Sequence, residues 1–110
     1  EYVLLRYDIA TGATLLLERQ VQLVDLSPDG HWLAWLAEDP ESGDLIKGGG
    51  GIRKVRHAAQ GRGKSGGVRA IYYWIKDRHQ IYMLVVYPKS KKDDLSDKET
   101  AILRELVKEL

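Results

Sequence analysis

The chain has 110 residues, of which 44% are hydrophobic and 30% charged, with a formal net charge of +1 and no cysteine. This length suits one compact domain, and the absence of cysteine excludes disulfides and thiolate metal sites and fits a reducing cytoplasm. No apolar run approaches the roughly 18 residues that a membrane-spanning helix needs, so we expect no membrane association.

The first 36 residues support two interpretations. In one of them, residues 2–9, 13–18 and 21–26 are strands, with turns at "ATG" and "SPDG". In the other, part of this segment is helical, and "HWLAWLAED" after "SPDG" is either a helix or a strand. We expect strands early in the chain and a short helix at about 31–39.

A loop and three strands follow. Residues 37–51 are expected to be a helix exit and a loop, because Pro40 ends what precedes it and glycines occupy positions 48–51. Runs rich in β-branched and aromatic residues predict strands at 52–59, 68–77 and 81–89, with a loop at 60–67. Only "DRHQ" separates the last two strands, which predicts an antiparallel hairpin.

The last segment, residues 96–110, has the features of a helix. Ser96 followed three residues later by Glu99 is a capping box, in which each side chain satisfies the backbone N–H of the other residue. Leu103, Leu106 and Leu110 form an apolar stripe with Ile102 alongside. We expect this stripe to pack on the sheet.

Positive charge is concentrated in the middle of the chain. Residues 52–92 contain eleven of the seventeen Lys and Arg residues and a single acid, Asp77, which gives this segment a net charge of +10 against −9 for the rest. Such a one-sided field attracts polyanions. The alternative is a solvated basic face that has no partner.

The segment "AAQGRGKS" invites comparison with a nucleotide-binding phosphate loop, which has the pattern G-x-x-x-x-G-K-[ST]. The first glycine of that pattern would fall at position 58, where the chain has Ala58, and a strand rather than a helix is expected to follow. Both requirements fail. We therefore interpret the segment as a basic connection between strands, whose glycines let cations approach a phosphate backbone.

Strand alternation is expected to gather cations on one surface. It places Lys54 and Arg56 on one face of their strand, and Arg69, Ile71 and Tyr73 on one face of the next. If these strands pair, the surface offers Arg forks, Lys charges and a Tyr ring, a combination that suits single-stranded RNA. The alternative for the tyrosines is burial, since aromatic residues of a central strand usually belong to the core.

Cleavage of RNA through its own 2′-hydroxyl requires a base, an acid and positive charge near the phosphorus. His57 is a candidate acid or base, although a lone histidine is more often structural. Lys54 or Lys64 is a candidate base, because neighbouring cations disfavour the charged form of a lysine. Acids are scarce where the cations lie, and Asp93 with Asp94 is only an adjacent pair before a helix, so we expect no metal site and no cofactor.

From about Asp39 to Leu110 the chain resembles the RelE/HigB-like toxins of bacterial toxin–antitoxin systems. The segments "GDLI", "G-x-RKVR", "GRGKSGGVR-x-IYY" and "YPK…DDL" carry the resemblance, in the order and spacing of that family. It implies an α+β fold, with a small twisted antiparallel sheet and a C-terminal helix packed on it. It also implies a cytoplasmic, ribosome-dependent mRNA endoribonuclease that blocks translation.

The resemblance further implies site residues and partners. The basic active-site residues of the family fall on Lys54, Arg56, Lys64, Arg69 and Lys89. Contacts to RNA are expected from Arg53, Arg62, Tyr73, Lys91 and Lys92. Some relatives use a tyrosine near the C-terminal helix as a further catalytic group. This chain has no tyrosine there, and Tyr73 or Tyr87 would be the nearby substitute. The implied partners are the ribosome, mRNA and a cognate antitoxin, often of the helix-turn-helix type, whose complex with the toxin binds operator DNA.

The N-terminal third departs from this family, which would have two amphipathic helices there. Instead, "YDIATGATLLL" and "LSPDGHWLAW" resemble one blade of a TolB-like β-propeller. We therefore expect an atypical segment at 1–36, as a fusion or a chimera, and a toxin domain at 37–110. Strands in the first segment would extend the toxin sheet or pair with another copy. The alternative to an enzyme is a basic module that binds nucleic acid or the antitoxin without cleavage.

Overall fold

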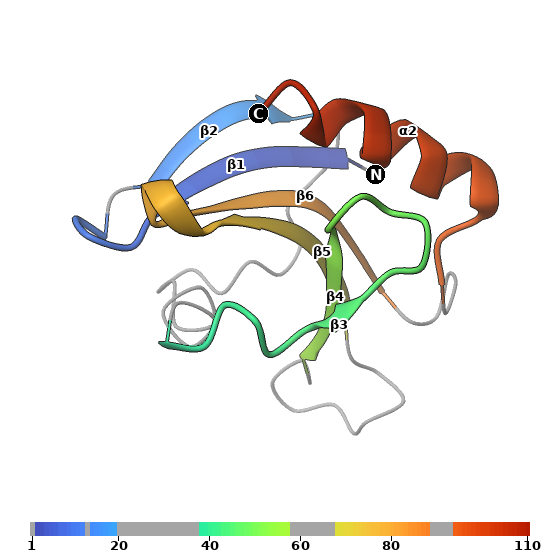
Figure 1. Ribbon diagram of the computed structural model, residues 1–110, viewed down its shortest axis with the longest axis horizontal. Coiled ribbons are helices and arrows are strands. Elements are labelled where there is room, and N and C mark those ends of the chain that lie inside the picture. The colour runs from blue at the N-terminus through green and yellow to red at the C-terminus, as the bar shows by residue number, and fades with distance from the viewer. Residues whose placement is uncertain (1, 13, 20–37, 58–67, 89–93) are drawn as a thin grey trace.

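The computed structural model describes residues 2–12, 14–19, 38–57, 68–88 and 94–110, and it combines an antiparallel sheet with a C-terminal helix (Figure 1). The strands are β1 Tyr2–Asp8, β2 Thr14–Arg19, β3 Asp44–Leu45, β4 Arg53–His57, β5 Val68–Ile75 and β6 Gln80–Pro88. A short 3-10 helix, η2, covers Lys76–Arg78, and the helix α2 covers Asp97–Val107. The expected α+β fold class is confirmed.

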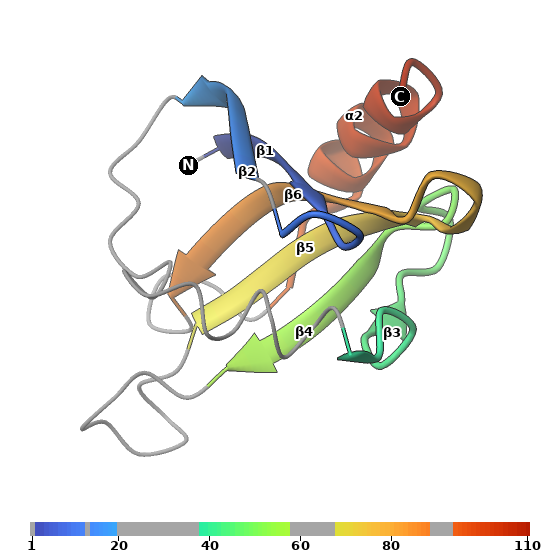
Figure 2. The ribbon, with the colours of Figure 1, turned by 90° about the vertical axis from the view of Figure 1, so that its left-hand side faces the viewer.

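The six strands form one sheet in the order β2-β1-β6-β5-β4-β3, with every neighbouring pair antiparallel. Figure 2 shows β4, β5 and β6 side by side in this curved sheet. The predicted hairpin of the last two strands is confirmed, and its turn runs through η2 and His79. His79 has a φ of 52°, a left-handed conformation that closes the turn.

The N-terminal strands join the same sheet, because β1 pairs with β6 from Leu5 opposite Met83 to Asp8 opposite Gln80. The early strands expected at 2–9 and 13–18 correspond to β1 and β2. A turn joins these two strands, with Gly12 at a φ of 71° and its N–H donating to the Asp8 carbonyl at 2.8 Å. The strand expected at 21–26 lies outside the described residues, and so does nearly all of the short helix expected at 31–39.

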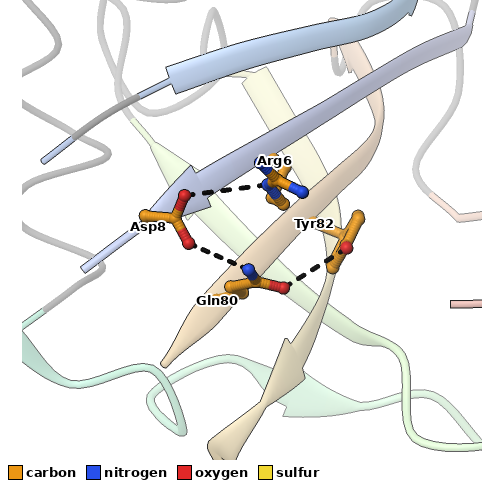
Figure 3. Close-up of polar contacts among 4 residues, drawn as sticks. All are labelled: Arg6, Asp8, Gln80 and Tyr82. Atoms are coloured by element: carbon orange, nitrogen blue, oxygen red, sulfur yellow. Dashed lines mark hydrogen bonds and ion pairs between the residues drawn. The ribbon is translucent and has the colours of Figure 1, made fainter. Parts of the chain in front are cut away.

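A polar network fixes the seam between β1 and β6 (Figure 3). The Gln80 side-chain amide donates to Asp8 Oδ1 at 2.9 Å and accepts from the Tyr82 hydroxyl at 3.3 Å. Arg6 Nε lies 3.7 Å from Asp8 Oδ2. Of these contacts, only the hydrogen bond from Gln80 to Asp8 crosses between the strands, and it joins residues that lie opposite each other, so it favours this alignment of β1 on β6.

The helix α2 packs on one face of the sheet, as the apolar stripe predicted. Leu103 and Val107 are buried in a cluster with strand residues that include Ile52, Ile71 and Tyr87. Full burial of a side chain of this size contributes about 1.5–3 kcal/mol. One expectation is corrected: Ile102, placed beside the stripe, is 59% exposed, because its position on α2 points away from the sheet.

The start of α2 is held by the capping box that the sequence predicted. The Glu99 backbone N–H donates to Ser96 Oγ at 3.1 Å, and the Ser96 N–H donates to Glu99 Oε1 at 2.9 Å. The helix continues only to Val107, with Lys108 as its C-cap, rather than to Leu110. Local hydrogen bonds therefore fix the start of α2.

The central strands contain a β-bulge. Ile71 lies opposite Val85 but its neighbour Tyr72 lies opposite Met83, so Leu84 is an extra residue of β6. Both Leu84 and Val85 belong to the cluster beneath α2. The bulge thus turns two consecutive side chains of β6 toward the helix.

On the other face, Tyr72 and Arg53 anchor the segment that precedes β3. The Tyr72 hydroxyl donates to the Pro40 carbonyl at 2.7 Å and accepts from the Gly43 N–H at 3.0 Å. An added Cβ at Gly43 would lie 2.6 Å from the Tyr72 hydroxyl oxygen, so only glycine fits there. Tyr72 itself is fully buried, which confirms the core alternative for this tyrosine.

Candidate nucleic-acid interface

Three cations of the basic segment share one face of the sheet. In the pairing of β4 with β5, Arg56 lies opposite Arg69, and Lys54 lies opposite Ile71. Side chains of directly opposed residues project from the same face of an antiparallel pair. Lys54, Arg56 and Arg69 are therefore neighbours, and we call them the cationic cluster.

The third strand adds an aromatic residue to this row. Arg69 lies opposite Tyr87 of β6, so Arg56, Arg69 and Tyr87 follow one another across three strands. Tyr87 is fully buried and packs in the cluster beneath α2. The cationic cluster thus borders the apolar core on the face of the sheet that carries α2.

The exposure of the three cations differs. Arg69 is buried, with only 4% of its surface exposed, whereas Arg56 is exposed. The Lys54 side chain is 17% exposed. A buried guanidinium is held more rigidly than a surface one, so Arg69 offers a fixed charge at the base of the cluster and Arg56 a charge at its rim.

Asp94, two residues before the N-cap of α2, forms an ion pair with Lys54. The hydrogen bond and charge of Lys54 hold the pKa of the Asp94 carboxyl below its ordinary value, and the charges of Arg56 and Arg69 lower it further. Lys54 is thus the member of the cluster that contacts this carboxylate, and Arg56 and Arg69 lie on the same face of the sheet.

The arrangement is suited to an anion with several oxygens. Arginine presents a planar fork of donors that matches phosphate or carboxylate, and lysine presents a compact charge. Two arginines and one lysine on one face of the sheet supply the kind of positive charge that stabilises a phosphate during transfer.

Several predicted residues lie elsewhere in the described structure. Arg53 donates through Nη1 to the carbonyls of Glu41 at 3.0 Å and Gly43 at 2.9 Å, on the face of β4 opposite to Lys54. Tyr73 is partly buried and packs against the cluster beneath α2. The RNA contacts predicted for Arg53 and Tyr73 stay predictions, and the structure gives both residues a packing role.

Of the remaining predicted residues, the structure describes only the backbone of His57. The backbone of His57 ends β4 opposite Val68, at the edge of the segment 58–67. The positions outside the described residues are those of Arg62, Lys64, Lys89, Lys91 and Lys92. Their predicted roles stay predictions.

Asp94 is the residue that sequence analysis missed. It was noted only as half of an adjacent acidic pair, because its ion pair spans 40 positions of the chain. One signal was present: Asp94 lies two residues before the capping box of a helix whose apolar stripe was expected to pack on the sheet.

Among the residues that the structure describes, no group of three or more His, Cys, Asp or Glu side chains is placed to bind a metal ion. No helix in the described ranges is long and apolar enough to cross a membrane.

The chain matches a known protein family. The sequence model of the family described as "RelE toxin of RelE / RelB toxin-antitoxin system" matches residues 36–110. This range contains β3 to α2 and the whole cationic cluster, whereas β1 and β2 lie before it.

Proposed function

The chain belongs to the RelE family of toxins from toxin–antitoxin systems, and on this premise we propose that it is a ribosome-dependent mRNA endoribonuclease that blocks translation. The family implies a cognate antitoxin as its partner. The observation that carries the proposal is that Lys54, Arg56 and Arg69 share one face of the sheet, where Lys54 already pairs with a carboxylate, because the same three groups would receive a phosphodiester.

In the proposed reaction, the RNA supplies its own nucleophile. The 2′-oxygen bonds to the adjacent phosphorus as its proton passes to a base, and the bond to the 5′-oxygen breaks as that oxygen gains a proton. The products are a 2′,3′-cyclic phosphate and a free 5′-hydroxyl. Arg56 and Arg69 stabilise the charge on the pentavalent phosphorus. Lys54 or Lys64 transfers protons, and His57, Tyr87 and Lys89 are further candidates.

The remaining proposals concern partners and location. Arg53, Arg62, Tyr73, Lys91 and Lys92 would contact mRNA or ribosomal RNA around the reacting phosphate. The antitoxin would be of the helix-turn-helix type, and operator DNA would be bound only by its complex with the toxin. The cytoplasm, where ribosomes translate, is the proposed compartment.

The test is induced expression of the full chain, with mapping of mRNA 5′ ends in ribosome-bound material. We expect growth arrest and new internal ends. Lys54→Ala and Arg69→Lys should each lower cleavage by about 10²-fold or more, since each weakens stabilisation of the transition state. Arg69→Lys keeps the buried charge and removes only the planar fork, so it is less disruptive than Arg69→Ala.

Lys76→Ala is the matched control, because Lys76 is an exposed cation of η2 outside the cationic cluster. It should leave the arrest unchanged. Normal growth with well-folded wild-type protein, or equal toxicity of all the variants, would contradict the proposed activity.

The second candidate is a basic module that binds nucleic acid or the antitoxin without cleavage. The net charge of +10 in residues 52–92 favours it, because charge alone gives salt-sensitive binding to a polyanion. Salt-sensitive binding with intact mRNA in the same mapping experiment would support this module and not the enzyme.

A further inference from the structure

Asp94 is attached to a fixed part of the molecule. The next residue, Leu95, packs against the apolar cluster beneath α2, and Ser96 forms the capping box with Glu99. The position of Asp94 is thus set by the packing of Leu95 on the core and by the capping of α2 that follows. The carboxylate is therefore delivered to the cationic cluster by the docking of α2.

The contact itself is asymmetric. The Lys54 side chain lies against the sheet and is 17% exposed, whereas the Asp94 side chain is 71% exposed. The carboxylate therefore reaches the lysine from the solvent side. This is the side from which an RNA strand would also have to approach.

A carboxylate and a phosphate oxygen are alternative acceptors for the same Arg and Lys donors. Asp94 already pairs with Lys54, and Arg56 and Arg69 lie on the same face of the sheet as that lysine. Asp94 also reduces the net charge of the site from +3 for the three cations to +2 for the four groups. An incoming phosphate thus meets a site that an anion of the same chain occupies.

We infer that Asp94 is a tethered competitor for the cationic cluster, which an RNA phosphate must displace from Lys54 in order to bind. The inference rests on the proposed function only in taking a phosphodiester of RNA as the ligand. It assigns Asp94 a role in specificity. RNA that makes no further contacts is held weakly, whereas RNA that is positioned by additional contacts displaces the carboxylate.

The experiment measures binding of a fluorescent 2′-O-methyl RNA oligomer, which lacks the nucleophile for cleavage, by anisotropy at roughly 50 and 200 mM salt. Asp94→Asn should bind about fivefold more tightly than wild type at the lower salt, since an exposed ion pair has about this strength. The salt dependence should also become steeper, because one more cation is free for phosphate.

Two variants serve as controls. Asp97→Asn removes the same charge from an exposed residue in the first turn of α2, and it should stay within about twofold of wild type. Asp94→Glu keeps the charge and should bind close to wild type. Thermal unfolding of each variant establishes that it is folded.

Equal or weaker binding by Asp94→Asn would overturn the inference and leave Asp94 as a group that only orients Lys54. An equal gain in Asp97→Asn, or no binding by any variant at low salt, would also overturn it. The two proposals fail separately. If Asp94→Asn binds RNA more tightly but the wild type cleaves no mRNA, the proposed enzymatic function is wrong and the inference about Asp94 stands. If the wild type cleaves mRNA but Asp94→Asn does not bind more tightly, the enzymatic function stands and the inference is wrong.

Discussion

At the scale of single residues, neighbouring positions on one strand have opposite tasks. Lys54 faces α2 and pairs with Asp94, whereas Arg53 turns to the other face and holds the carbonyls of Glu41 and Gly43. Tyr72, which lies opposite Arg53, ties the same segment through Pro40 and Gly43. The sheet thus separates the cation that pairs with Asp94 from the cation that holds the segment before β3.

The Tyr72 hydroxyl leads to a prediction about pH. Burial raises the pKa of the Tyr72 phenol above its ordinary value of 10.0, and the hydrogen bond from Gly43 and the charge of Arg53 offset this only in part. Because the folded pKa is the higher one, the protonated phenol stabilises the fold below pH 10. That contribution is lost as the pH rises through the folded value.

Tyr72→Phe should therefore lower the free energy of unfolding by about 1–3 kcal/mol at neutral pH, since the buried Gly43 N–H loses its acceptor. The difference from wild type should shrink above pH 10. Urea unfolding at neutral and alkaline pH measures both effects, with Tyr73→Phe as the matched control. An equal loss in the two variants would mean that the hydroxyl of Tyr72 has no special role.

The sequence predicted part of the site at this scale. Alternation along β4 and β5 placed Lys54 and Arg56 on one face of one strand and Arg69 on one face of the next, because that rule depends only on local geometry. That the two faces coincide follows from the register of β4 on β5. Alternation could not predict Asp94, since the ion pair depends on where α2 docks. Nor could it separate Tyr72 from Tyr73, because their burial depends on which face of the sheet is covered by which segment.

At the scale of elements, α2 links the core to the site. Its buried residues Leu103 and Val107 secure it to the sheet, and its N-terminal cap lies two residues after Asp94. The capping box was predictable because the signal is contained within four residues. The bulge at Leu84 was not predictable, because Leu84 and Val85 break the alternation that identifies a strand face.

Ser96→Ala tests the cap. It removes the acceptor for the Glu99 N–H and should lower the free energy of unfolding by about 1 kcal/mol, as measured in urea. Lys98→Ala, in an exposed residue of the same turn, should change stability by less than about 0.5 kcal/mol. Should the two variants lose equal stability, the capping hydrogen bonds would not be what holds this end of α2.

At the scale of the whole molecule, the sheet extends beyond the part that the family model matches. The match begins at residue 36, yet β1 runs beside β6 and β2 lies outside β1. Sequence analysis left open whether these strands would join the toxin sheet or another copy, because the choice of a pairing partner is a long-range matter. The structure places β1 on β6 and secures it with the network of Asp8, Gln80 and Tyr82.

Removal of residues 1–35 should therefore destabilise the remaining chain. The deletion turns β6 into an edge strand with unpaired N–H and C=O groups, which favours association between copies. Size-exclusion chromatography with light scattering should show oligomers that grow with concentration, and unfolding should occur at lower urea. A monomeric fragment as stable as the full chain would show that β1 is dispensable to the sheet.

The extra residue in β6 has a consequence for the exchange of segments between related proteins. Before Leu84, Tyr82 faces α2, and after it Val85 and Tyr87 face α2. The alternation of side chains between the two faces therefore shifts by one position at the bulge. When two related proteins are joined at a point within β6, the row of Arg56, Arg69 and Tyr87 is preserved only if both proteins have the same number of residues in this strand. Loss of one residue there would rotate Tyr87 to the far side while every local sequence motif stayed intact.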